Sequence, residues 1–149
     1  MSAEVARQVA LVTGASRGIG QAVASALAVA GYVVVGTATT ASGAEGITRR
    51  LAGFDGCTGE VLDVNDSLQA QALIDKVVRQ HGGLHVLVNN AGITRDMLAM
   101  RLRDEDWDAV MDTNLKAVFR MSRAAIRPMM KQRFGRIINI TSVVGASGN

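Results

Sequence analysis

A strand, a glycine-rich turn and a helix are encoded by the stretch Leu11-Val12-Thr13-Gly14-Ala15-Ser16-Arg17-Gly18-Ile19-Gly20. The apolar, partly β-branched residues 9–12 are typical of a strand that is buried on both faces of a parallel sheet. After Gly18 apolar residues recur at steps of three and four, which predicts a helix. Its apolar face is predicted to contain Ile19, Val23, Ala26, Leu27 and Ala30. Such a helix directs free N–H groups and its positive dipole end at the turn, a position that suits a pyrophosphate.

The glycines of this stretch are expected to have separate physical roles. Gly14 permits a tight turn with a positive φ, Gly18 lets an anion approach the backbone, and Gly20 lets the helix pack closely on the strand. Their spacing is Gly-x-x-x-Gly-x-Gly, which differs from the commoner Gly-x-Gly-x-x-Gly of dinucleotide-binding turns. The alternative is an ordinary helix-entry loop, and the change from strand to helix around the glycines favours nucleotide binding.

Length and composition bound the possible functions. The 149 residues suffice for one domain with a real core, and 48% hydrophobic with 19% charged residues is a globular composition. No apolar run approaches a membrane span and residues 1–7 lack a signal-peptide pattern, so we expect a cytoplasmic protein. Cys57 alone forms no disulfide or metal cluster and is expected to be a small core residue. A net charge of +3 without a basic aromatic stripe argues against nucleic acid and leaves an acidic partner open.

The second predicted strand, residues 32–37, bears on the choice of cofactor. NAD-binding domains carry an acid near the end of this strand, whereas NADP needs the position free of negative charge and a cation nearby. Here the strand ends in Thr37-Ala38-Thr39-Thr40, and Arg17 in the glycine loop supplies a guanidinium. The sequence therefore predicts NADP(H), with a solvated loop arginine as the alternative for Arg17.

Further strands are predicted at residues 58–64, 84–88 and 136–141, giving a Rossmann-like, doubly wound α/β fold with a parallel sheet in the order 3-2-1-4-5. Four more helices are expected. The first covers residues 42–51, and the second follows Asp66 with an apolar side made of Leu68, Leu73, Ile74, Val77 and Val78. The third covers residues 104–113, with Trp107 and Val110 facing inward, and the fourth covers residues 115–133. The last helix is apolar over a broad surface, which predicts a subunit interface as well as core.

Two polar sequences lie at predicted strand ends. Asp63 ends the third strand, where it is placed to accept a hydrogen bond from an adenine amino group, and helix capping shared with Asn65 and Asp66 is the alternative. Asn89-Asn90-Ala91-Gly92 ends the fourth strand, where small residues admit a ligand and paired amides lock the loop to neighbouring strands. An ordinary Asn-Gly turn is the alternative there. No metal site is predicted.

Taken in chain order, the glycine loop, the polar sequences at the ends of the third and fourth strands, Asn114 and Ser142 closely resemble the motifs of the short-chain dehydrogenase/reductase family. Residues 13–20 are similar to the family's cofactor loop, residues 63–64 to its adenine contact and residues 89–92 to its strand-four motif. The cofactor-binding residues implied are Gly14, Ser16, Arg17, Gly18, Ile19, Gly20, Thr39, Asp63, Val64, Asn90, Ala91 and Gly92. Asn114 and Ser142 match two of the family's four catalytic positions.

The resemblance implies hydride transfer from NADP(H) to a ketone, with a tyrosine as proton donor and a lysine that lowers the pKa of that tyrosine. Ser142 would contact the substrate by donating a hydrogen bond to the same oxygen. Asn114 would hold a water in the proton relay by distorting its helix locally. A strand-end serine and a mid-helix amide are the structural alternatives.

Within the family, residues 89–96 and 141–145 most resemble members that reduce 3-oxoacyl groups on acyl carrier protein in type II fatty acid synthesis. This implies acyl carrier protein as partner and a homotetramer. A basic group, Arg127, Lys131, Arg133 and Arg136, would meet an acidic carrier, or is a solvated helix end. Alternatives are reduction of acetoacetyl-CoA or another ketone, and a non-catalytic nucleotide-binding module.

The family's Tyr-x-x-x-Lys pair is expected on the helix after Ser142, and this sequence reaches Asn149 without it. The one tyrosine, Tyr32, falls in the second predicted strand. Residues 1–149 are therefore expected to be an NADP-binding Rossmann domain cut off before that helix. In such a piece the fifth strand would be an unpaired edge with uncovered apolar residues.

Overall fold

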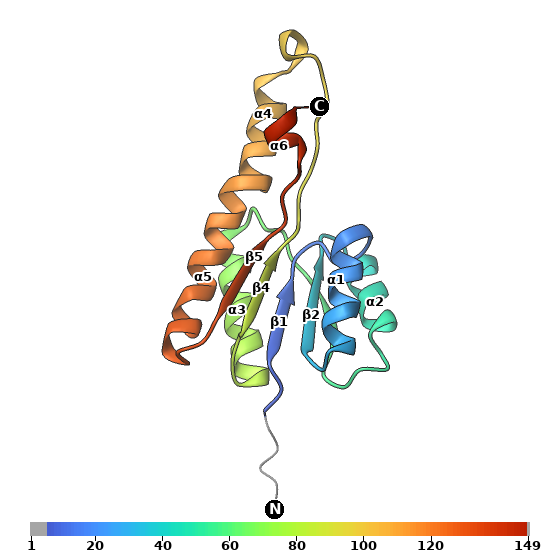
Figure 1. Ribbon diagram of the computed structural model, residues 1–149, viewed down its shortest axis with the longest axis vertical. Helices are drawn as coiled ribbons and strands as arrows, with labels where there is room; N and C mark the ends of the chain where they lie inside the picture. The colour runs from blue at the N-terminus through green and yellow to red at the C-terminus, as the bar shows by residue number, and fades with distance from the viewer. Residues whose placement is uncertain (1–5, 149) are drawn as a thin grey trace, which may run out of the picture.

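The computed structural model describes residues 6–148 (Figure 1). Most of the segment examined for a signal peptide, and Asn149, lie outside the described residues. The strands are β1 (Val9–Val12), β2 (Val33–Ala38), β3 (Thr58–Val61), β4 (Val86–Asn89) and β5 (Arg136–Asn139). The helices are α1 (Gly18–Val29), α2 (Ala41–Arg50), α3 (Ser67–His81), α4 (Asp104–Met111), α5 (Ala117–Lys131) and α6 (Val144–Ser147), with a 3-10 turn at Ala99–Arg101 and a π-helix at Asp112–Lys116.

The five strands form one parallel sheet in the order β3-β2-β1-β4-β5, as predicted. Helices cover both faces (Figure 1), and the alternation of side chains along β1 divides the core between them. Val9 and Leu11 pack with residues of α3 and α5, whereas Ala10 and Val12 pack with residues of α1 and α2. All four side chains are fully buried, which explains the uninterrupted apolar run in the sequence.

The buried face of α1 differs from the predicted one. Gly20, Ala24 and Ala28 are buried, while Ile19 is 61% exposed. The prediction placed the larger apolar residues inward, but small residues at steps of four let the helix axis approach the sheet closely. Val23 and Leu27 still pack at the edges of this contact, and Ala26 and Ala30 are exposed.

Two further predictions of which side chains face the core are wrong, one in α3 and one in α4. Leu68 is 81% exposed in the first turn of α3, although Leu73, Ile74 and Val77 are buried as predicted. Trp107 is 56% exposed and Val110 is half-buried, because α4 continues beyond the carboxyl ends of the strands, where the described sheet does not reach it (Figure 1).

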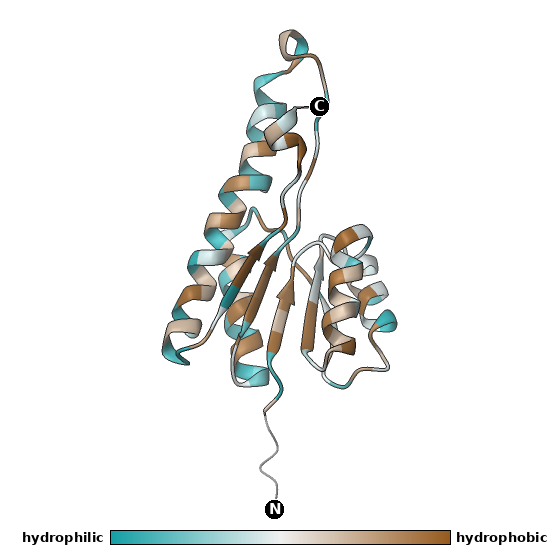
Figure 2. Ribbon diagram, viewed as in Figure 1, coloured by the Kyte–Doolittle hydropathy of each residue, from teal (hydrophilic) through white to brown (hydrophobic). Residues whose placement is uncertain are grey.

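The expectation that α5 has more apolar surface than the sheet can cover is confirmed. Met121 and Ala125 are buried against the sheet, whereas Phe119 is 60% and Met130 72% exposed. Apolar and polar segments alternate along α5 in Figure 2. At the adjacent sheet edge, every residue of β5 is exposed and Ile138 is 47% exposed. In the described part of the chain, β5 is thus the apolar edge that the sequence predicts.

Candidate functional site

The loop between β1 and α1 has the conformation that its glycines were expected to provide. Gly14 and Gly18 have positive φ values of 63° and 56°. A Cβ atom added to Gly20 would lie 2.1 Å from the carbonyl oxygen of Gly14, so only glycine allows this approach of helix to loop. A Cβ added to Gly18 would meet no atom within 4 Å, so the space beside it is open to a ligand.

Asn90 holds this loop against the end of β4. Its Nδ2 atom donates to the carbonyl oxygens of Thr13 and Gly14, at 3.1 and 3.0 Å. In return, the backbone N–H groups of Asn90 and Ala91 both donate to Oγ1 of Thr13 at 3.0 Å. Thr13 is 1% exposed and was not singled out from the sequence. The signal that would have found it is a hydroxyl between the buried strand and Gly14.

The neighbouring amide, Asn89, points away from the loop. Its Nδ2 atom donates to Oδ1 of Asn139 on β5 at 2.9 Å and lies 3.3 Å from Oγ of Ser122 on α5. The two amides therefore fix β4 to neighbours on either side, which confirms that they lock the loop to neighbouring strands.

Asn114 lies in the π-helix between α4 and α5, so the predicted local distortion of the helix at this residue is confirmed. Its Oδ1 atom accepts from the N–H of Ile93, and its Nδ2 atom donates to the carbonyl of Ile93, both at 2.8 Å. One N–H and one lone pair of the amide remain available beyond this pairing. A Cβ on Gly92 would lie 3.2 Å from Oδ1 of Asn114, which explains a glycine there.

A cavity of about 630 Å³ joins the elements at the carboxyl ends of β4 and β5. It brings together six residues predicted for the site: Arg17, Asn90, Ala91, Gly92, Asn114 and Ser142. Ser142 follows β5, and its Oγ atom accepts from the N–H of Val144 at 3.3 Å, which leaves the hydroxyl proton free to be donated. The other predicted cofactor residues do not line this cavity: Gly14, Ser16, Gly18, Ile19, Gly20, Thr39, Asp63 and Val64.

Those remaining residues follow the carboxyl ends of β1, β2 and β3, the same edge of the sheet. Asp63 is exposed and its Oδ1 atom accepts from the N–H of Asn65 at 2.9 Å. The cap of α3 is Asp66, which accepts from the N–H groups of Leu68 and Gln69. The side chain of Asp63 is therefore not the cap of α3. Val64, in contrast, is buried and 7% exposed.

The positive charge near the glycine loop is not neutralised within the described residues. Arg17 is exposed at the N-terminus of α1, forms no ion pair there, and the first turn of α1 carries no acid. Thr39 is exposed just beyond β2. The helix dipole and the guanidinium thus both favour an anion at this place.

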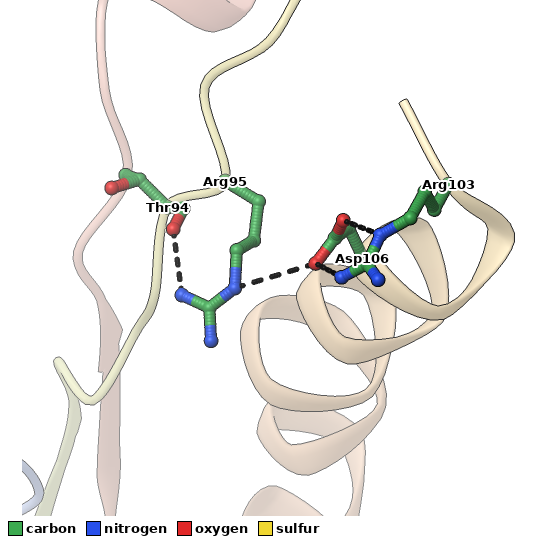
Figure 3. A network of polar contacts seen from close by, with 4 residues as sticks. All are labelled: Thr94, Arg95, Arg103 and Asp106. Carbon is green, nitrogen blue, oxygen red and sulfur yellow. Dashed lines mark hydrogen bonds and ion pairs between the residues drawn. The ribbon is translucent and has the colours of Figure 1, made fainter. Parts of the chain in front are cut away.

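One wall of the cavity is tied to α4 by charged side chains that the sequence did not reveal (Figure 3). Arg95, which lines the cavity with Thr94, places Nε 3.7 Å from Oδ1 of Asp106. Arg103 donates to Oδ2 of the same carboxylate at 3.0 Å, and this hydrogen bond raises the pKa of Arg103. Asp106 therefore links the segment after β4 to the start of α4.

Neither Tyr32 nor His85 lines the cavity. Tyr32 directly precedes β2, at the amino ends of the strands, whereas Ser142 lies at the carboxyl ends. Tyr32 is therefore too far from this cavity to donate a proton there. His85 accepts the N–H of Val9 on Nδ1 at 2.9 Å, and burial lowers the pKa of its imidazole.

Across residues 6–148, no group of three or more His, Cys, Asp or Glu side chains is arranged to hold a metal. Nor is any helix of that range long and apolar enough to cross a membrane.

A doubly wound parallel sheet with a glycine-lined, cationic turn at its carboxyl edge defines the chain as an α/β domain of the dinucleotide-binding class. Residues 8–149 match the family model described as short chain dehydrogenase. The chain belongs to the short-chain dehydrogenase family.

Relatives within this family are similar over 95% of the chain. The 3-oxoacyl-[acyl-carrier-protein] reductase FabG of Escherichia coli (strain K12) is 51% identical over 142 residues, and that of Haemophilus influenzae is also 51% identical over 142 residues. The FabG protein of Pseudomonas aeruginosa is 53% identical over 144 residues. The chain spans 57% of the length of the first of these relatives and 58% of each of the other two.

Proposed function

We propose that the protein reduces 3-oxoacyl groups carried on acyl carrier protein to 3-hydroxyacyl groups, with NADPH as the reductant, in fatty acid synthesis. The observation that carries the proposal is the cavity that gathers Arg17, residues 90–92, Asn114 and Ser142 from four separate segments. The names of the relatives, which are 49–53% identical, supply the substrate class.

The residues at the carboxyl edge fit a dinucleotide with an added phosphate. Open space beside Gly18 and the free N–H groups at the start of α1 suit a pyrophosphate. The six residues directly after β2, 39–44, include no acid to repel a 2′-phosphate, and Ser16, Arg17 and Thr39 offer hydroxyls and a guanidinium. When bound, this cofactor supplies the hydride.

Ser142 and Asn114 have different roles in the proposal. Ser142 donates its free hydroxyl proton in a hydrogen bond to the ketone oxygen, where negative charge develops during reduction. Asn114 holds the cavity wall at Ile93 and has one N–H left to order a water. The donor of the proton is proposed to be a tyrosine, assisted by a lysine, outside residues 1–149, since Tyr32 lies at the opposite edge.

The proposed carrier would be attracted by a basic surface formed by Arg127, Lys131, Arg133 and Arg136, all of them exposed. This surface lies where α5 ends and β5 begins, at the end of the sheet opposite the cavity, so its proposed role is to attract the carrier and not to line the site. A carrier protein with an acidic surface would be attracted to this group. The exposed apolar residues of α5, Phe119 and Met130 among them, support a homo-oligomer, for which we propose a tetramer. Because the acyl group is carried by a protein and not by a lipid, we propose the cytoplasm as the location.

The test is the oxidation of NADPH by the purified protein, followed by absorbance, with acetoacetyl groups on acyl carrier protein and on coenzyme A. The proposal predicts the higher kcat/KM with the carrier-bound substrate. A higher kcat/KM with the coenzyme A ester would favour a ketone reductase of the same family, and NADPH binding without turnover would favour a nucleotide-binding module.

A further inference from the structure

Arg50, at the end of α2, reaches the glycine loop from a helix that contains none of the predicted site residues. Its Nη2 atom donates to the carbonyl oxygen of Ser16 at 3.5 Å, across 34 positions of sequence. Ser16 directly precedes Arg17, so two cationic residues converge on one short stretch of the loop. Within the described residues, Arg50 has no carboxylate partner.

The sequence of α2 leaves a path for this long side chain. Side chains of a helix lean toward its N-terminus, and residues four and seven positions before Arg50 lie on the same face. Those positions are Gly46 and Gly43, which carry no side chain, and the atom that comes nearest to the space beside Gly46 is Nη2 of Arg49. A Cβ added to Gly43 would lie 3.7 Å from Cβ of Ser16, which shows how closely this face meets the loop.

The place that Arg50 reaches is the junction between the glycine loop and the end of β2. The N–H of Ala15 donates to the carbonyl of Thr37 at 2.8 Å, which holds the loop on that strand end. Thr40 caps α2 by accepting the N–H of Gly43, and the first turn of α2 carries no acid. The junction therefore combines the positive end of the α2 dipole with the guanidinium of Arg50, while Arg17, the next residue of the loop, lines the cavity described above.

We propose that Arg50 is a second cationic recognition residue, beside Arg17, for the 2′-phosphate of NADP(H). A guanidinium carries five N–H donors, and the bond to Ser16 uses one of them, so donors remain for a phosphate. This inference rests on the proposed use of NADPH. It adds a residue that selects NADPH over NADH and that acts from outside the glycine loop.

The test compares Arg50→Gln, Arg50→Lys and the matched control Arg49→Gln, whose exposed side chain pairs with Glu45 on another face of α2. Dissociation constants for NADPH and NADH are measured by fluorescence titration of the purified proteins. We expect Arg50→Gln to weaken NADPH binding about fivefold and to leave NADH binding unchanged, as suits one exposed charge contact. Arg50→Lys should retain most of the affinity, and Arg49→Gln all of it.

Equal losses for NADPH and NADH in Arg50→Gln would show that Arg50 only positions the loop through Ser16, and would overturn the inference. Unchanged NADPH binding in Arg50→Gln would also overturn it, while the proposed function stands as long as the unmodified protein prefers NADPH. If the unmodified protein shows no such preference, the proposed cofactor is wrong as well. The two failures are thus distinguishable from one set of titrations.

Discussion

Asn114 and Ile93 are joined by a reciprocal pair of hydrogen bonds, in which the side-chain amide of Asn114 both donates to and accepts from the backbone of Ile93 at 2.8 Å. The amide imitates a neighbouring strand and so holds the segment that follows β4. Because Asn114 lies in the π-helix, the irregular turn presents its side chain to this segment and to the cavity at once.

Replacing Asn114 by alanine removes both bonds to Ile93. We expect faster hydrogen exchange at Ile93, a loss of about 1–2 kcal/mol in the free energy of unfolding and a reduced kcat. Hydrogen exchange followed by mass spectrometry measures the first effect. Lys116→Ala is the control, since that side chain is 59% exposed in the same π-helix. Unchanged exchange at Ile93 in Asn114→Ala would show that the pairing does not hold the segment.

Gly20→Ala should be severely destabilising. The new methyl group would lie 2.1 Å from the Gly14 oxygen and 2.4 Å from Nδ2 of Asn90, so the loop must move. We expect a loss of about 3 kcal/mol or more in the free energy of unfolding, measured by urea denaturation, together with loss of NADPH binding. Gly46→Ala is the matched control within α2, and its methyl group has space, so it should leave stability equal or slightly higher.

Stability should fall as the pH falls below about 6.5, in part through His85. Burial lowers the pKa of this imidazole in the folded state, so the unfolded chain binds more protons in that range. Protonation of Nδ1 also removes the acceptor for the N–H of Val9. His85→Gln should reduce the pH dependence of the melting temperature between neutral and mildly acidic pH. Parallel profiles for the unmodified protein and His85→Gln would refute this role.

Reversing the charge of Arg17 should change cofactor preference. Arg17→Glu places a carboxylate beside the proposed 2′-phosphate, so the dissociation constant for NADPH should rise about tenfold or more, and that for NADH by much less. Titrations at low and at high salt provide an internal check, because the difference should shrink as screening increases. Equal losses for both cofactors would remove the charge argument for NADPH.

The glycine loop was predictable because it depends on local sequence, and the sheet order because alternating strands and helices indicate the doubly wound topology. The apolar run in β1 reflects burial on both faces, and the positive φ of Gly14 and Gly18 follows from the need for a tight turn. The gathering of Asn90, Asn114 and Ser142 at one cavity was predictable from the order of strands, since each lies at or near the carboxyl edge.

Other features depend on contacts between distant segments and left no local pattern. The buried face of α1 is made of glycine and alanine, so a search for large apolar residues selected Ile19 instead of Ala24. The ion pair between Arg95 and Asp106 is set by the path of the chain after β4, not by spacing. In the same way, the reach of Arg50 to Ser16 appears only when α2 is placed beside the loop.

The most direct measurement is the kcat of the Ser142→Ala variant for NADPH-dependent reduction of an acetoacetyl group on acyl carrier protein, alongside its dissociation constant for NADPH. The account predicts a kcat lower by about 10²–10³, as expected for the loss of one hydrogen-bond donor to the developing oxyanion, with NADPH binding unchanged. A variant that keeps the kcat of the unmodified protein would contradict the placement of Ser142 in the reacting site and the reductase mechanism built on it.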